Sequence, residues 1–306
     1  MSEPSARTIR INDEDVRIWE KGRGAPVVVL AGFGGLPRWS DFLERLCRTR
    51  RVIAPSLPGF PGGGRAHDRL DTQMDWLIAA HDLVAAAGGG PVDLIGVSVG
   101  AALAADVAAL WPNLVRRLVL VSPLGLCDLS DPPLDIFAQP PGGMDVALTA
   151  DPATYRRHMA KPDGVDELEW QILVLRANEA AARILWPLGD TGLGKRMRRI
   201  TAPTLIVMGE ADKILPRSYA RKFAGGVGGK ATVKTIPGAG HLADLDAPEA
   251  LAKMALAHCG GAVTSASAAA RGKKKSTPAR AKPRSGAKAK PAGRAAGKKR
   301  RAAKRR

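Results

Sequence analysis

The sequence predicts an α/β protein in which a mostly parallel sheet carries helices on both faces and a helical insertion covers one edge. Strand-like and helix-like segments alternate through residues 1–127 and again through residues 200–260. Several of the strand-like runs are continuously apolar, which is typical of strands buried on both faces of a parallel sheet. No convincing strand occurs in residues 128–199. We therefore expect one core in two parts, with residues 128–199 forming a helical cap over the carboxyl edge of the sheet.

The first part of the core begins with a predicted hairpin, Thr8–Ile11 and Val16–Trp19, whose turn is Asn-Asp-Glu-Asp. Helices are predicted where apolar residues recur at helical spacing, as they do at Phe42, Leu43 and Leu46. Four further strands are expected at Pro26–Ala31, Arg51–Ala54, Val92–Val97 and Leu118–Ser122. Three helices are expected at Trp39–Cys47, Asp71–Ala87 and Val99–Leu110.

The insertion starts with a stretch rich in proline and glycine and continues with two helical segments, Ala153–Ala160 and Val165–Leu185. The alternation then resumes, which completes the core. The remaining elements are predicted as strand Thr204–Met208, helix Ser218–Ala224, strand Thr232–Ile236 and helix Pro248–His258.

The charge of this 306-residue chain is concentrated at its end: residues 261–306 contain 17 Lys and Arg and no acidic residue. Residues 1–260 are nearly neutral, with 30 Lys and Arg against 29 Asp and Glu, although the whole chain carries +18. The tail contains no aromatic residue and little that can be buried, so we expect it to be disordered. Residues 271–306 are expected to bind a polyanion such as DNA, RNA or polyphosphate without sequence preference. The alternative is a solvated tail without a dedicated partner.

Several classes of protein and of site are not indicated. Cys47, Cys127 and Cys259 are odd in number and widely scattered, without the spacing of a metal site, so no metal is expected and they are interpreted as reduced thiols. The N-terminal residues lack the apolar region of a signal peptide, and no run is long and apolar enough for a transmembrane helix. We expect a cytoplasmic protein, nucleoid-associated or polyanion-associated through its tail. The sequence predicts no oligomeric state.

The strongest functional signal is Gly96-Val97-Ser98-Val99-Gly100, because it joins an apolar strand directly to an Ala-rich helix. A serine on such a sharp turn projects its hydroxyl out of the packing, and the glycines let strand and helix approach closely. The N–H of Val99, at the start of the helix, is directed to where an oxyanion would form. Ser98 is therefore the predicted nucleophile.

A serine nucleophile needs a base, and the base needs a carboxylate. His241 follows the last predicted strand in a glycine-rich loop, from which an imidazole can reach back over the sheet edge. Asp212 follows the preceding strand by a few residues at the same edge, with Glu210 and Asp128 as alternatives. The order Ser98, Asp212, His241 is that of the hydrolase triad on an α/β sheet.

Residues 7–260 resemble a cap-bearing serine α/β-hydrolase of the esterase and lipase type. The resemblance rests on four segments that occur in the order of that family: Leu30–Gly35, Gly96–Gly100, Pro203–Pro216 and Gly240-His241. It implies an eight-stranded sheet, no cofactor, and the N–H of Phe33 as a second oxyanion donor beside that of Val99.

The reaction expected from these residues is cleavage of an acyl bond in a small apolar carboxylic ester, lactone or thioester through an acyl-enzyme. Members that hydrolyse carbon–carbon bonds of ring-fission products often have Asn before the serine and Trp after the histidine, where this chain has Val97 and Leu242. That reaction remains an alternative, as does a hydrolase-fold protein that binds a ligand without turnover and is tethered to nucleic acid by its tail.

Apolar residues near the expected site are candidates for the substrate pocket, although each is equally well explained as hydrophobic core. Besides Phe33, they are Phe60, Leu124, Phe137, Met159, Trp170 and Trp186.

Overall fold

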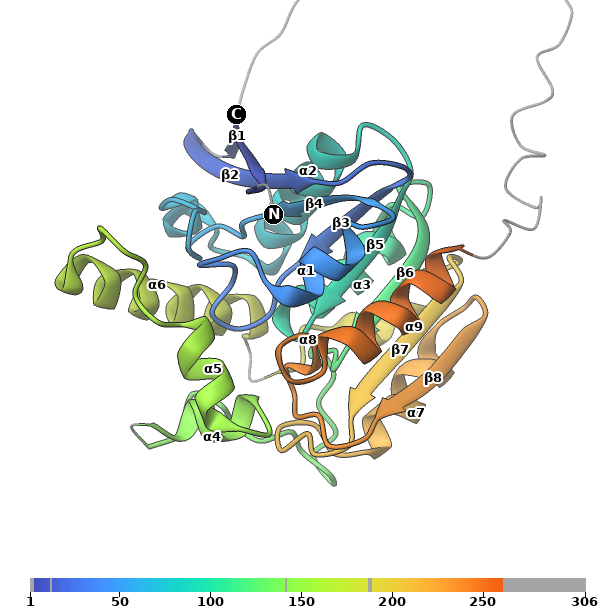
Figure 1. Cartoon of the computed structure of the whole chain (residues 1–306). Coiled ribbons are helices and arrows are strands. Elements are labelled where there is room, and N and C mark those ends of the chain that lie inside the picture. The colour runs from blue at the N-terminus through green and yellow to red at the C-terminus, as the bar shows by residue number, and fades with distance from the viewer. Residues whose placement is uncertain (1–2, 12, 141, 187–188, 261–306) are drawn as a thin grey trace, which may run out of the picture. The chain divides into compact units, whose positions relative to one another are not determined.

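The computed structural model describes residues 3–11, 13–140, 142–186 and 189–260, and these contain one eight-stranded sheet. The strand order is β1-β2-β4-β3-β5-β6-β7-β8 (Figure 1). Antiparallel pairing joins β1 to β2 and β2 to β4, and every other pair is parallel. The strands are β1 (Ser5–Ile11), β2 (Glu14–Lys21), β3 (Pro26–Leu30), β4 (Arg51–Pro55), β5 (Val92–Val97), β6 (Val115–Val121), β7 (Thr204–Gly209) and β8 (Ala231–Ile236). The predicted fold class is confirmed.

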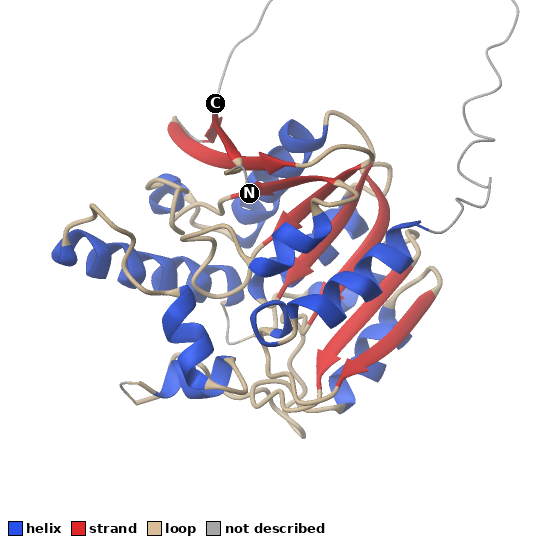
Figure 2. Cartoon of the chain, in the orientation of Figure 1, coloured by secondary structure: helices blue, strands red, loops and turns tan. Residues whose placement is uncertain are grey.

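Helices cover both faces of the sheet (Figure 2). On one face, α1 (Asp41–Leu46) packs against α9 (Pro248–Gly260). On the other, α2 (Gln73–Gly88) packs against α3 (Val99–Leu110). The helix α7 (Ser218–Gly226) packs against β7 and β8. All five helices were expected from the sequence pattern.

Buried apolar strands form the centre of the molecule. Every residue of β5 and β7 is buried, and so is nearly every residue of β3 and β6. This is the environment that continuously apolar strands require. Residues that follow these strands at their carboxyl ends are consequently held against a rigid support.

The regular elements within the described residues of the insertion between β6 and β7 are all helices. The insertion contains α4 (Gly143–Leu148), α5 (Pro152–His158), α6 (Glu167–Leu185) and the 3₁₀-helices η2 (Leu193–Lys195) and η3 (Met197–Arg199). The two longer segments were predicted, but α4 was not, because its proline- and glycine-rich surroundings favour turns. The 3₁₀-helices η2 and η3 were not predicted either, nor were two short elements outside the insertion, η1 (Ala66–Arg69) and α8 (Ala243–Asp246).

The predicted tail, residues 261–306, lies outside the described residues. Among the residues that the structure does describe, no helix has the length and apolar character needed to span a membrane.

Candidate active site

Ser98 occupies a sharp turn between β5 and α3, as its motif predicted. Its backbone has φ 53° and ψ −117°, a conformation that non-glycine residues rarely adopt. The turn is possible because Gly96 and Gly100 have no side chain. A Cβ at Gly96 would lie only 2.5 Å from the Cα of Ala101, and one at Gly100 only 2.4 Å from the carbonyl oxygen of Ala31. The two glycines therefore allow the close passage of strand and helix that holds Ser98 at the sheet edge.

The structure brings Ser98, His241 and Asp212 into one hydrogen-bonded chain. Ser98 Oγ lies 2.7 Å from His241 Nε2, and His241 Nδ1 lies 2.9 Å from Asp212 Oδ2 and 3.1 Å from Oδ1. An ionised carboxylate can only accept, so the proton of a neutral imidazole resides on Nδ1 and Nε2 accepts from the serine hydroxyl. This arrangement can transfer the hydroxyl proton to the imidazole.

Asp212 is held as an oriented, ionised acceptor. Its Oδ1 accepts hydrogen bonds from the N–H groups of Ile214 at 2.9 Å and Leu215 at 3.0 Å. Burial raises the pKa of the Asp212 carboxyl, but the facing His241 and these two N–H groups together hold that pKa below its ordinary value. The two alternatives are engaged elsewhere, Glu210 with Arg217 and Asp128 with Lys222.

The cap closes over this chain of residues. Ser98 and His241 have no exposed surface. The loop after β3, which carries Phe33, lies under α5: His158 Nε2 donates to the carbonyl oxygen of Gly35 at 3.1 Å, and a Cβ at Gly34 would lie 2.5 Å from Met159 Sδ. Burial lowers the pKa of His158, which favours the neutral ring in this contact. In this conformation Ser98 and His241 are therefore closed off from solvent.

Most of the predicted pocket residues gather around this loop. The rings of Phe33 and Phe137 are 5.8 Å apart, and a Cβ at Gly35 would lie 3.1 Å from Phe60 Cβ. The N–H of Leu124 lies 3.5 Å from the carbonyl oxygen of Ser98.

The two candidate tryptophans lie near opposite ends of α6 and differ in how far they are buried. Trp170 is buried and donates its Nε1–H to the carbonyl oxygen of Met159. Trp186, at the end of α6, is 68% exposed.

Sequence reasoning missed the two acidic residues that follow His241. Asp246 Oδ2 accepts from the N–H of Gly240 at 2.8 Å, and Asp244 has a buried Oδ1 without a hydrogen-bond partner. Burial raises the pKa of the Asp244 carboxyl to about 7, and the Asp246 carboxylate contributes to that rise. The signal that could have found them is the recurrence of carboxylates within a few residues of the predicted base.

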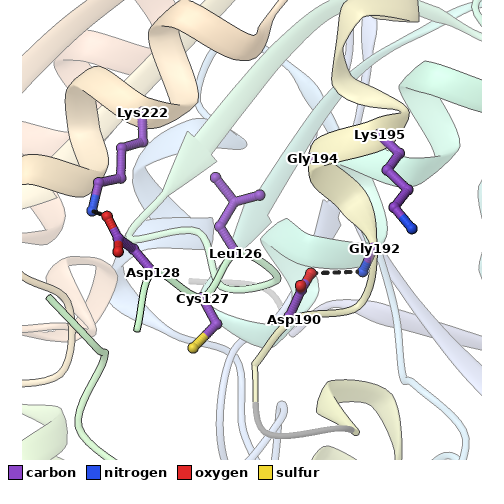
Figure 3. Close-up of a pocket in the computed structure, with 8 residues that line it drawn as sticks. All are labelled: Leu126, Cys127, Asp128, Asp190, Gly192, Gly194, Lys195 and Lys222. Atoms are coloured by element: carbon purple, nitrogen blue, oxygen red, sulfur yellow. Dashed lines mark hydrogen bonds and ion pairs between the residues drawn. The ribbon is translucent and has the colours of Figure 1, made fainter. Parts of the chain in front are cut away.

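A separate cavity of about 300 Å³ lies beyond the end of β6 (Figure 3), and its lining does not include Ser98, Asp212 or His241. Its lining carries two acidic and two basic side chains. Lys222 pairs with Asp128 at 2.6 Å, and Asp190 accepts from the N–H of Gly192. Its lining consists of Leu126, Cys127, Asp128, Asp190, Gly192, Gly194, Lys195 and Lys222. No group of residues suited to hold a metal ion occurs among the described residues.

Comparison with known proteins agrees with this fold. The chain is 31% identical over 271 residues to the dihydrolipoyllysine-residue acetyltransferase component of an acetoin cleaving system from Pseudomonas putida, covering 83% of this chain and 69% of that protein. It is 28% identical over 214 residues to the 2-hydroxy-6-oxo-2,4-heptadienoate hydrolase of Pseudomonas putida, covering 66% of this chain and 77% of the relative.

A solved structure of a serine hydrolase involved in carbazole degradation superposes with a TM-score of 0.63 at 26% identity, covering 83% of this chain and 98% of that one. The model of the alpha/beta hydrolase family matches residues 27–254. The chain belongs to the alpha/beta hydrolase family.

Proposed function

We propose that this protein is a serine hydrolase that cleaves an acyl bond of a small apolar carboxylic ester, lactone or thioester. The observation that carries the proposal is the continuous hydrogen-bonded chain from Ser98 Oγ through His241 to Asp212. A serine, a histidine in the acceptor tautomer and an ionised carboxylate are the parts that nucleophilic acyl transfer requires.

In the proposed reaction, Ser98 Oγ attacks the acyl carbonyl carbon while its proton moves to His241 Nε2. The N–H groups of Phe33 and Val99 stabilise the resulting oxyanion, and loss of one such donor typically costs about 3–4 kcal/mol in the barrier. His241 then protonates the leaving oxygen or sulfur, and the acyl group remains on Ser98. Water, deprotonated by His241, attacks the acyl-enzyme, and His241 returns that proton to Ser98 Oγ as the acid is released.

The immediate surroundings of Ser98 support acyl transfer from an apolar substrate to the serine. A Cβ at Gly32 would lie 2.8 Å from Leu242 Cδ2, 3.1 Å from Ser98 Cβ and 3.3 Å from Val97 Cγ1. Val97 and Leu242 are therefore close to the nucleophile, and both are buried and apolar. The wall that they form offers no side-chain hydrogen bond to a second polar group of the substrate.

Hydrolysis of a carbon–carbon bond is the second candidate, and the name of one relative supports it. That relative is named as a hydrolase of 2-hydroxy-6-oxo-2,4-heptadienoate. This compound has no ester or amide, so its hydrolysis breaks a carbon–carbon bond. Against this reaction stand Val97 and Leu242, at the two positions where the resemblance leads us to expect Asn and Trp in such enzymes.

The first test is labelling of the full-length protein with a fluorophosphonate, followed by peptide mapping. We expect selective modification of Ser98 that is lost in Ser98→Ala and His241→Ala. Turnover of p-nitrophenyl esters, thioesters and lactones is then compared with turnover of a 2-hydroxy-6-oxo-dienoate. Preference for the dienoate would replace the acyl proposal by the second candidate, and a folded protein that does not label would favour a ligand-binding role without turnover.

We further propose that residues 271–306 bind polyanions and so localise the enzyme to nucleic acid or polyphosphate. The support is the run of Lys and Arg without acidic residues. Retention on DNA should fall steeply with salt and should be lost when residues 262–306 are deleted, while esterase activity stays unchanged. Equal retention of the full-length and truncated proteins would rule the proposal out.

A further inference from the structure

Asp246 joins the loop of His241 to the cap through a single oxygen atom. Its Oδ2 accepts one hydrogen bond from the N–H of Gly240 and another from the N–H of Ala150, both at 2.8 Å. Gly240 immediately precedes His241, and Ala150 lies between α4 and α5 of the cap. Charge-assisted hydrogen bonds of this kind are stronger than neutral ones.

The other side of His241 is also bonded to the cap. The N–H of Leu242 donates to the carbonyl oxygen of Leu148 at 2.8 Å. A Cβ at Gly240 would lie 2.7 Å from the nitrogen of Ala150 and 2.9 Å from Asp246 Oδ2, so the two segments approach as closely as a residue without a side chain permits. Both neighbours of His241 in the chain are thus fixed to the segment 148–150.

The same part of the cap contacts the loop that carries Phe33. The helix α8, which ends at Asp246, packs against α5 on one side and α9 on the other (Figure 1). At its far end α5 reaches the loop after β3 through His158 and Gly35. Movement of the cap therefore acts on the base and on the expected oxyanion donor at once.

We propose that Asp246 is a positioning residue that orients His241. Through its hydrogen bond to Ala150, it makes that orientation depend on the position of the cap. The inference rests on the proposed function, since it assigns His241 the role of base. Asp246 itself accepts hydrogen bonds from the backbone N–H groups of Gly240 and Ala150 and takes no part in bond making.

Three variants separate the parts of this proposal. Asp246→Ala removes the acceptor. Asp246→Asn keeps a side-chain oxygen that can accept both hydrogen bonds but removes the charge. Glu249→Ala is the matched control, because Glu249 is an exposed carboxylate three residues further on whose ion-pair partner is Arg45.

The readout is the rate at which fluorophosphonate labels Ser98 in the folded full-length protein. We expect a fall of about 100-fold in Asp246→Ala, because a displacement of about 1 Å in a catalytic group has this effect. Asp246→Asn should recover most of the rate, and Glu249→Ala should match the wild type. A lowered melting temperature with an unchanged labelling rate in Asp246→Ala would overturn the proposal and leave Asp246 a purely structural residue.

Nitrogen NMR of the His241 ring distinguishes failure of this inference from failure of the proposed function. If the wild type does not label, the hydrolase proposal is wrong, but the ring shifts still report whether Asp246→Ala changes the tautomer and hydrogen bonding of His241. Unchanged shifts would overturn the positioning role. If Asp246→Ala does not fold, Gly240→Ala serves instead, since its Cβ forces the same two segments apart, and an unchanged labelling rate in that variant would also overturn the role.

Discussion

Two buried aspartates at opposite ends of the sheet show what separates a structural carboxylate from a reactive one. Asp93, near the amino end of β5, faces three arginines: Arg116 at 2.9 Å, Arg50 at 3.5 Å and Arg117 at 3.9 Å. Asp212, at the carboxyl end of β7, faces His241. Their side chains are 0% and 2% exposed, so burial does not distinguish them.

The difference is in the partners. Arginine does not lose its proton in proteins, so the three partners of Asp93 cannot exchange a proton with it and only join β5 to β6 and to the residue before β4. Histidine changes its protonation near neutral pH, and its second ring nitrogen reaches Ser98, so the cluster around Asp212 can move a proton. The strand β5 contributes to both clusters, with Asp93 at one end and Ser98 just beyond the other.

The largest effect is expected from Ser98→Ala. Loss of the nucleophile should lower kcat for an ester by about 10⁶-fold, to the residual rate that oxyanion stabilisation and binding provide. Stability should fall by at most about 1–3 kcal/mol, because the one group lost is the buried hydroxyl that donates to His241 Nε2. Steady-state hydrolysis and urea unfolding check both expectations, and full turnover by this variant would disprove the role of Ser98.

Asp212→Asn should follow, with a fall of about 10⁴-fold in kcat, because the amide can hold His241 in the wrong tautomer. The size and position of the side chain hardly change, so KM should be little affected. A loss in KM alone, measured with the same ester, would mean that Asp212 binds the substrate and does not orient the base.

Asp93→Ala should have the opposite signature and thus sharpen the comparison. One buried and two half-buried arginines lose a common partner, which should lower the free energy of unfolding by about 3–5 kcal/mol. The activity per folded molecule should stay at the wild-type level. Urea unfolding together with active-site titration tests this, and a reduced rate per active site would show that the two ends of β5 are coupled.

The smallest effect is expected from Asp244→Asn, and it depends on pH. Because the pKa of Asp244 is raised to about 7 in the folded protein, the folded state keeps a proton that the unfolded chain has released. Wild-type stability should therefore fall as the pH rises towards 7, and Asn should remove this loss. The advantage of the variant should grow by about 1–3 kcal/mol between pH 5 and pH 8 in urea unfolding. An advantage independent of pH would contradict this assignment.

The sheet and the three hydrogen-bonded residues Ser98, Asp212 and His241 could be predicted from the sequence because each signal is local. A glycine-flanked serine between strand and helix, and an aspartate and a histidine after successive strands, all lie at the edge that parallel strands share. The cap contacts could not be predicted in this way. The hydrogen bonds from His158 to Gly35 and from Ala150 to Asp246 join segments far apart in the chain, and they depend on packing that no short pattern encodes. Asp93 was likewise hidden, because a single acidic residue in an apolar strand does not reveal its arginine partners.

The position of the cap in the chain has a consequence for synthesis. In the finished sheet, β6 pairs with β5 on one side and with β7 on the other. The ribosome makes residues 122–203 between these two strands, so the apolar strand Val115–Val121 has no partner on its second side while the cap is being made. The insertion that buries the nucleophile in the folded protein thus prolongs the time during which the nascent chain presents an open, aggregation-prone edge.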